Sequence, residues 1–287
     1  MARIQYLFKV LKKYLNKTEK QCPFCKGGEF SLIGKKYFLL QLLKCNACKL
    51  MFRYPTEEIS ENIKFYQSEY KEGMTTKLPD ESRFQEYLNT CFSNTEKDFS
   101  EKIKIVKSLK SNGKLLDFGC SWGYETLQLQ NNGFDVIGFE ISKSRANFGK
   151  TKLGLTILDD YSLLHSMKDE SFDIVFSSHV LEHLPNLYSI FEMFYRLLNR
   201  NGYLIIFVPN CSGIEKYEVF TAKKLYAFGE KHTMAFDDLF FKQNLPKYGF
   251  DVKCISSPYD TNNLFNKEKS SYDTEYSELF VLCRKVG

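Results

Sequence analysis

Short apolar runs alternate with amphipathic segments from about residue 113 to the end of the chain. Five runs have the apolar content of buried strands: Lys114–Phe118, Asp135–Glu140, Leu155–Leu158, Phe172–Ser177 and Tyr203–Val208. Between them lie segments with helical periodicity: Tyr124–Asn132, Lys143–Leu153 and Ser189–Leu198. Strands that alternate with helices at this spacing form βαβ units, and such units build a parallel sheet.

Two further apolar runs close the chain, Asp251–Ser256 and Leu279–Arg284. They follow the break at Pro246 and Gly249 and have only a loop between them, so we expect them to pair antiparallel. The pattern therefore predicts an α/β fold. It has a Rossmann-like sheet of seven strands with helices on both faces, and its last strand is inserted in the opposite sense.

The first 110 residues are patterned differently. Residues 4–15 have apolar side chains at helical spacing with lysines between them, and residues 21–54 are rich in turn formers around two cysteine pairs. Residues 61–110 are largely helical in pattern. These shifts predict four segments: a basic amphipathic helix (1–20), a small cysteine-rich lobe (21–58), a helical connector or lid (59–110) and the α/β domain (111–287).

Charge is concentrated at the amino-terminal end. The formal net charge is +5, and the first sixty residues carry +8, so the remainder sums to −3. A body with this charge is not typical of a general nucleic-acid binder, and nucleic acid is not expected as a partner. No apolar run approaches the ~18 residues that span a bilayer.

The basic amphipathic helix has two interpretations. Lysines on one face and apolar side chains on the other permit weak, peripheral contact of residues 1–17 with an anionic membrane surface. The alternative, which we favour, is that the apolar face packs on the cysteine-rich lobe or on another subunit.

The two cysteine pairs predict a zinc site. Cys22, Cys25, Cys45 and Cys48 form the spacing C-x2-C-x19-C-x2-C, which is typical of a zinc ribbon. Four sulfur ligands leave no open position on the metal, so we expect a structural site whose loss unfolds the lobe and spares the α/β domain. The amino-terminal charges are interspersed with apolar residues, unlike a secretory signal, and we therefore expect a reducing, cytoplasmic setting.

A glycine turn follows the first strand of the α/β domain. Leu115–Gly123 reads as a strand, a tight turn containing Gly119, and the start of a helix whose N–H groups can face an anion. Glu140 ends the next strand, where a carboxylate can accept both hydroxyls of a ribose. The pair of features predicts a nucleoside cofactor. Ser121 stands where a dinucleotide site has its second glycine, which argues against a nicotinamide cofactor.

At this point the chain resembles class I S-adenosylmethionine (SAM)-dependent methyltransferases of the type 11/23 kind. The resemblance covers residues 113–287 and rests on Leu116–Gly123, Phe172–Val175, His179–Leu184 and Asn201–Asn210. It implies SAM as cofactor. It also implies a set of contacts: Gly119, Gly123, Ser178 and His179 at the methionine end, Asp117 near the amino group, Glu140 on the ribose and Asp160 by the adenine.

The whole arrangement is similar to that of some bacterial methyltransferases of sugars, in which a zinc ribbon and a helical connector precede the methyltransferase fold. Phe65–Tyr70 resembles their aromatic connector, which implies that Tyr70 touches the cofactor. Gly229–Phe236 resembles their E-H-x-x-x-F segment, with Lys231 in place of the glutamate. His232, or failing that His183, is then the general base, a role that suits the pKa of histidine.

These features lead to one main hypothesis and two alternatives. The main one is SAM-dependent methyl transfer to a small molecule, in the first place a sugar or sugar nucleotide, by an enzyme with a structural zinc site. One alternative is a methyltransferase of ribosomal or transfer RNA with an amino-terminal zinc module. The other is a catalytically silent cofactor-binding module, against which the intact glycine turn and Glu140 argue. Neither the acceptor atom nor the oligomeric state follows from the sequence.

Overall fold

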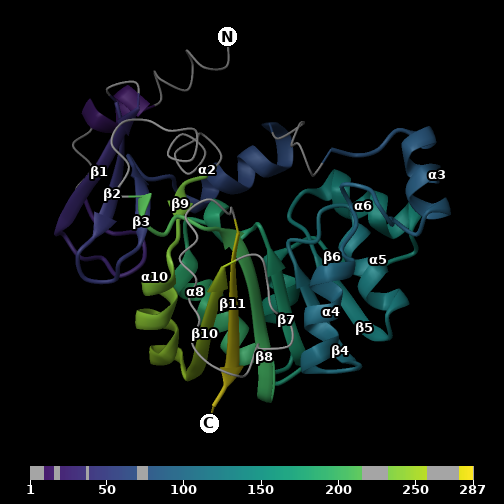
Figure 1. Ribbon diagram of the computed structural model, residues 1–287. Helices are drawn as coiled ribbons and strands as arrows, with labels where there is room; N and C mark the ends of the chain where they lie inside the picture. Colours follow the sequence, from purple (N-terminus) through teal and green to yellow (C-terminus); the bar gives the residue numbers. More distant parts are fainter. Residues whose placement is uncertain are drawn as a thin grey trace.

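A seven-stranded sheet forms the centre of the molecule (Figure 1). The computed structural model describes residues 10–15, 20–36, 39–69, 77–214, 232–256 and 278–286. Across the sheet the order is β10 (Phe250–Ser256), β11 (Glu278–Lys285), β8 (Leu198–Pro209), β7 (Phe172–Ser178), β4 (Gly113–Phe118), β5 (Phe134–Phe139) and β6 (Ile157–Leu158). Neighbouring strands from β8 to β6 are parallel, whereas β11 is antiparallel to both of its neighbours. The predicted α/β fold and its reversed last strand are confirmed.

Helices cover both faces of this sheet because successive strand residues point to opposite sides. Leu115, Ile174 and Ile205 pack under α4 (Ser100–Leu109) and α5 (Tyr124–Asn131). Their sequence neighbours Leu116, Val175 and Ile206 belong to a second cluster, on the opposite side of the strands. Helices α7 (Tyr161–His165), α8 (Leu187–Leu197) and α10 (Asp238–Asn244) pack there, followed by the 3-10 turn η4 (Leu245–Tyr248). Helix α6 (Lys143–Lys152) packs beside β6.

The stretch before the large sheet is helical, as its pattern predicts, but in separate pieces. They are α2 (Ile59–Lys64), the π-helix η1 (Phe65–Glu69), α3 (Glu81–Asn89) and α4. Helix α3 packs onto the glycine turn, since Phe84 and Tyr87 share a buried cluster with Trp122. These helices therefore support the turn that follows β4.

A second, smaller sheet contains the amino-terminal strands. It consists of β1 (Phe30–Lys36), β2 (Leu40–Cys45), β3 (Met51–Tyr54) and β9 (Met234–Ala235), all antiparallel. Strand β9 comes from the far end of the sequence and lies beside β3 in Figure 1. The cysteine-rich lobe therefore includes a strand that the sequence places inside the α/β domain.

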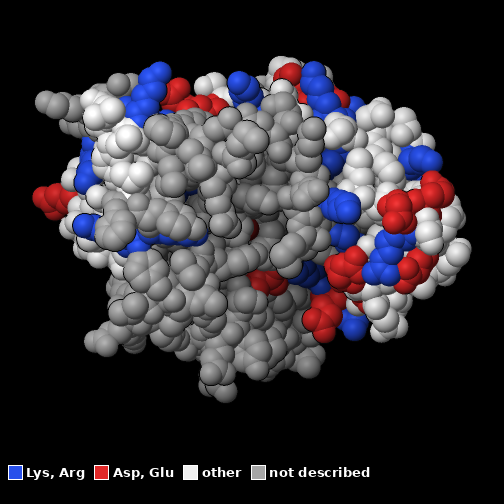
Figure 2. Space-filling view, turned by 90° about the horizontal axis from the view of Figure 1, so that it is seen from above, with Lys and Arg blue, Asp and Glu red and all other residues white. Residues whose placement is uncertain are grey.

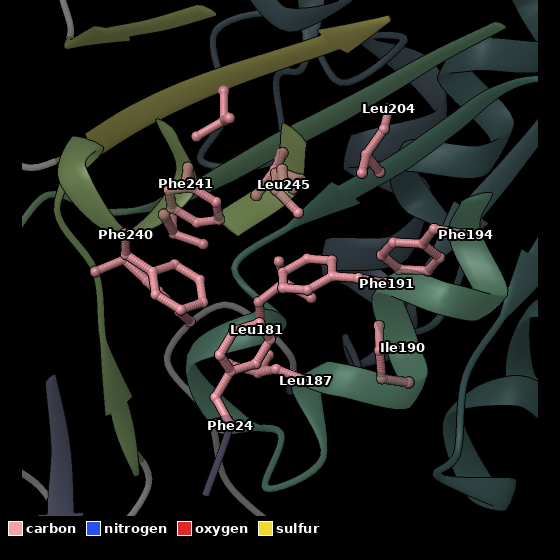
Figure 3. Packing of buried hydrophobic residues seen from close by; sticks show 14 of the residues in the cluster. Phe24, Leu181, Leu187, Ile190, Phe191, Phe194, Leu204, Phe240, Phe241 and Leu245 are labelled. Atoms are coloured by element: carbon pink, nitrogen blue, oxygen red, sulfur yellow. The ribbon is translucent and has the colours of Figure 1, made fainter. Parts of the chain in front are cut away.

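The lobe also shares its hydrophobic core with the large sheet. Phe24, next to one cysteine pair, lies among side chains of α8 and α10 (Figure 3). Its ring centroid is 6.2 Å from that of Phe191 and 5.2 Å from that of Phe240. Asn244 of α10 donates a hydrogen bond of 2.8 Å to the carbonyl oxygen of Cys48. Apolar and polar contacts together fix the lobe against α10.

This shared core yields a first prediction. Phe24→Ala removes a buried ring from the junction, and a Phe→Ala truncation in a core costs about 3–5 kcal/mol. We expect the free energy of unfolding, measured by urea denaturation of the full chain, to fall by about that amount. Leu32→Ala, at a half-exposed position on β1 of the same lobe, is the control and should change it little. Equal stabilities of the two variants would contradict a shared core.

Residues 10–15 are helical and pack on the lobe. Val10 is buried in a cluster with Leu40 and Met51. The ammonium group of Lys13 donates a 2.8 Å hydrogen bond to the carbonyl oxygen of Thr56, while Leu15 remains 73% exposed. For these residues the packing alternative holds. The rest of the predicted helix lies outside the described residues, so its membrane contact stays a prediction. Within the part of the chain that is described, no helix has both the length and the apolar character of a membrane span.

Candidate active site

Two glycines shape the turn after β4. Gly119 and Gly123 both have φ of +89°, a left-handed conformation that glycine adopts without strain. A Cβ atom on Gly119 would lie 2.2 Å from Cγ2 of Val180, and one on Gly123 would lie 2.4 Å from Cδ1 of Leu155. Both positions therefore need glycine for space as well as for conformation.

Glu140 is tied to the same turn. The backbone N–H of Ser121 donates to its Oε2 at 3.0 Å, and the N–H of Ser142 donates to its Oε1 at 2.7 Å. Burial raises the pKa of Glu140, while these N–H groups and Arg145 act in the opposite direction. Ser121 has φ of +52°, a left-handed conformation that is uncommon for a residue with a side chain.

A pocket opens beside Glu140 at the carboxyl ends of the parallel strands, where open α/β sheets bind their ligands. The pocket is open to solvent at its mouth, and its empty space with the mouth included is about 660 Å³. The lining residues come from strand ends, from α2 and η1, and from the segment after β7, and include Asn62, Tyr66, Gly119, Glu140, Tyr161, His179 and His183. The connector thus forms one wall of the pocket.

The predicted cofactor residues fall into two groups. Gly119, Glu140 and His179 line the pocket. Asp117 lies beneath the turn, where it accepts a 2.7 Å hydrogen bond from the hydroxyl of Thr126, and burial raises its pKa to about 7. Gly123 begins α5 behind the turn.

Of the three remaining residues predicted to contact the cofactor, two lie beside the pocket and one is not among the residues that the structure describes. Asp160 caps α7 by accepting a 2.8 Å hydrogen bond from the N–H of Ser162, and the adjoining Tyr161 is the residue that lines the pocket. Ser178 accepts a 3.0 Å hydrogen bond from the ammonium group of Lys102. Tyr70 lies outside the described residues.

His179 is held between two carboxylates. Its Nε2 is 2.5 Å from Oε1 of Glu278, and its Nδ1 is 3.4 Å from Oε1 of Glu182. Although burial lowers it, the two carboxylates raise the pKa of His179 to about 9. The imidazole is therefore a cation at neutral pH. Lys102 and Glu278, which pair at 2.7 Å, were not found from the sequence because they come from α4 and β11 and belong to no local motif.

His183 and His232, the two candidate bases, lie together. Their ring centroids are 4.7 Å apart. His183 belongs to the 3-10 turn η2 (Leu181–His183), and the backbone N–H of Thr233 donates a 3.0 Å hydrogen bond to the carbonyl oxygen of Glu182 in the same turn. This bond fixes the segment that carries His232 against η2. Glu182 itself was missed as a site residue, although it stands beside His183 in the sequence.

The four cysteines of the lobe converge as their spacing predicts. Their sulfur atoms all lie within 4.8 Å of one another, with 3.5 Å between Cys22 and Cys48 and between Cys25 and Cys45. A tetrahedral zinc ion with Zn–S bonds of about 2.3 Å separates its sulfurs by ~3.8 Å. Each pair sits on a tight turn, closed by the N–H of Lys26 on Cys22 and by that of Lys49 on Cys45. The sulfur atoms are therefore arranged as a zinc ion requires.

The chain is similar in sequence to known methyltransferases. The family described as "Methyltransferase domain" matches residues 116–206. Among curated proteins, the chain is 26% identical over 126 residues to phosphoethanolamine N-methyltransferase 1 of Zea mays, covering 42% of this chain and 24% of that one. It is 31% identical over 123 residues to a ubiquinone biosynthesis O-methyltransferase of Pelagibacter ubique, covering 41% and 50%. The chain thus spans half or less of the length of these relatives.

Solved structures show the same fold. A SAM-dependent methyltransferase from Archaeoglobus fulgidus superposes with a TM-score of 0.52 at 18% identity, over 70% of this chain and 99% of that one. Phosphoethanolamine N-methyltransferase 2 of Haemonchus contortus, in complex with SAM, superposes with a TM-score of 0.55 at 14% identity, over 83% and 62%. The sheet order, the glycine turn with Glu140 and the family match agree, and the chain carries a class I SAM-dependent methyltransferase domain.

Proposed function

We propose that the protein transfers a methyl group from SAM to a small-molecule acceptor, in the first place a sugar or sugar nucleotide. The observation that carries this proposal is one pocket with Glu140 on one side and His183, paired with His232, on another. The relatives named as phosphoethanolamine and ubiquinone-biosynthesis methyltransferases support a small acceptor. The sugar assignment rests on the likeness of the lobe and connector to those of sugar methyltransferases.

The pocket residues suit SAM, which supplies an activated methyl group. Each carboxylate oxygen of Glu140 accepts one backbone N–H and retains a lone pair for a ribose hydroxyl. Gly119 keeps this wall of the pocket clear, since a side chain there would collide with Val180, another lining residue. The cationic His179 stands at the pocket wall, where it can attract the carboxylate of the methionine moiety.

The acceptor's proton is removed, in this proposal, at the pair of His183 and His232. Methyl transfer to a hydroxyl oxygen needs that oxygen to lose its proton, and a positioned histidine is the commonest group for the task. His183 lines the pocket together with Tyr66 and Asn62, and His232 lies next to His183. Asn62 donates a 2.7 Å hydrogen bond to the carbonyl oxygen of His183 and so helps to fix its backbone.

We also propose that the four cysteines hold one structural zinc ion. All four available ligands are sulfur, which leaves no position for a substrate. The ion would join the two turns that carry the cysteine pairs, and with them the strand β2 to the segment that presents Phe24.

The distribution of charged side chains on the face shown in Figure 2 gives less support to the RNA alternative. In the view of Figure 2, acidic and basic side chains of the described residues are intermixed around the rim, without a broad field of one sign. A nucleic-acid surface normally presents a basic stripe. Transfer of labelled methyl groups from SAM to a sugar-nucleotide mixture, with ribosomal RNA in parallel, separates the two acceptor classes.

Binding of SAM to the full chain tests the cofactor assignment. Glu140→Ala removes the acceptor of the ribose hydroxyls, and hydrogen bonds to a charged group contribute about 1.5–3 kcal/mol. We therefore expect calorimetry to show SAM affinity falling by roughly 10–150-fold. Asp135→Ala, at an exposed position on the same strand, is the control and should bind as the wild type does. Equal binding by the Glu140 variant, or no binding by the wild type, would overturn the assignment.

A further inference from the structure

We propose that Glu182, His183 and His232 form a second metal site, which binds a divalent transition metal such as zinc at the acceptor end of the pocket. The site is separate from the four cysteines and uses a different set of donor atoms. Its existence rests on the geometry and burial described below. The role that we give it in the reaction rests on the proposed function.

The three side chains meet at one point. One ligand atom from each lies within 4.8 Å of the other two. A tetrahedral zinc ion binds histidine nitrogen and carboxylate oxygen at about 2.0–2.2 Å, so its ligands stand roughly 3.3–3.6 Å apart. A bound ion would draw the three side chains closer together. The hydrogen bond from the N–H of Thr233 to the carbonyl oxygen of Glu182 already joins the two segments that carry them.

The carboxylate of Glu182 gives the second, independent observation. Its side chain is 2% exposed, and among the described residues neither of its oxygens has a hydrogen-bond partner. Its nearest charged neighbours are imidazole nitrogens, at 3.4 Å for His179 and 3.9 Å for His183. Buried carboxylates are normally hydrogen-bonded several times, because burying an unsatisfied charge is costly. The imidazolium of His179 lies 3.4 Å from one of its oxygens but outside hydrogen-bond geometry, and a bound cation would supply the direct contact that is missing.

The donor set indicates the kind of metal. Two imidazoles and one carboxylate suit zinc and neighbouring transition metals, and three protein ligands leave a position open. His179 does not complete the set, since its Nε2 is already held by Glu278. His183 lines the pocket, so the open position faces the space where an acceptor would bind. The four-cysteine site, in contrast, is closed.

The open position deepens the proposed function by selecting an acceptor class. A hydroxyl oxygen bound to the ion has a lowered pKa and releases its proton to solvent water. A lone pair of that oxygen then forms the bond to the methyl carbon, while the carbon–sulfur bond breaks and its electrons pass to sulfur. In this refinement of the proposed function, His183 and His232 act as ligands of the ion rather than as bases, and the ion activates the hydroxyl at the same place in the pocket. The acceptor is therefore a compound that presents a hydroxyl group, not an amine.

Metal analysis of the full chain tests the site. After saturation with zinc and dialysis, the wild type should retain a second zinc ion beyond that of the cysteines. Glu182→Gln and His232→Ala should each lose the second ion, with affinity for it weakened by at least about 100-fold, more than the loss of an outer-shell partner causes. Glu192→Gln and His165→Ala, which lie outside the cluster, are the matched controls and should retain it. A wild type with no ion beyond that of the cysteines, or a second ion retained by both cluster variants, would overturn the proposal.

Cobalt substitution separates the two sites without an activity assay. Cobalt bound to thiolates gives an intense sulfur-to-metal charge-transfer band, whereas cobalt on imidazole and carboxylate gives only weaker visible bands. We expect the Glu182 variant to lose the weaker bands and keep the charge-transfer band, which also shows that the chain remains folded. SAM calorimetry in parallel distinguishes the failures: binding of SAM without a second metal refutes this site alone, whereas absence of SAM binding refutes the proposed function.

Discussion

His232→Ala should lower the turnover of methyl transfer by roughly 10²–10⁴-fold, the range for loss of a positioned proton acceptor. In the proposed function His232 and His183 form one centre, with ring centroids 4.7 Å apart, and loss of His232 removes either a base or a ligand of the ion that activates the acceptor. SAM affinity should stay near that of the wild type, because Glu140 and Gly119 bind a different part of the pocket. The measurement is release of the demethylated cofactor under single-turnover conditions, with calorimetry for SAM.

One control variant and one further test variant accompany this measurement. His165→Ala, on α7 and outside the cluster, should retain full turnover. His183→Ala should lose activity to an extent similar to that of His232→Ala, since each removes half of the pair. Near-normal turnover in both His183 and His232 variants would show that alignment of acceptor and methyl group alone drives the reaction.

Cys45→Ser/Cys48→Ser should destabilise the chain by several kcal/mol, which is a large part of the 5–15 kcal/mol that stabilises an ordinary domain. These substitutions remove two of the four ligands of the proposed zinc ion. Because Phe24 packs on Phe240 and Asn244 donates to Cys48, we expect the loss of order to reach α10 as well as the lobe. Hydrogen exchange should therefore rise in both, while the strands β4 and β7 keep their protection.

The control for this pair is Cys91→Ser, an exposed cysteine away from the lobe, which should leave stability and metal content unchanged. The double variant should also lack the thiolate charge-transfer band of cobalt. If it retains that band and unfolds at the same denaturant concentration as the wild type, the four cysteines do not hold a metal. Rapid exchange confined to the lobe would support the simpler expectation from the sequence, in which the α/β domain is unaffected.

The large sheet was predictable because most of its strands are long enough to show as apolar runs in the sequence. Each of β4, β5, β7 and β8 buries a continuous apolar run between two layers of helices, and such runs are visible in the sequence. Glu140 was found for a related reason, since its position is set by the length of one βαβ unit. In both cases residues that are near one another in the sequence are enough to predict the feature.

The contacts between distant segments were not predictable in this way. Strand β9 has two residues, too few for any alternation, and its partner β3 lies about 180 residues earlier in the chain. Glu278 reaches His179 from β11, and Lys102 of α4 pairs with Glu278, although no motif joins the three residues. Ser121 was recognised as an exception to the glycine pattern, but only the structure shows that its N–H binds Glu140 from a left-handed conformation.

The pairing of β9 with β3 limits which segments of this protein can be exchanged with those of a homologue. Met234 and Ala235 pair with Phe52 and Met51, and His232 lies just before them in the chain. The amino-terminal lobe thus helps to position His232, which we propose as a catalytic residue. A lobe exchanged with that of a homologue would have to bring the segment 232–245 with it to keep the geometry. The two segments therefore form one structural unit, although about 180 residues separate β3 from β9.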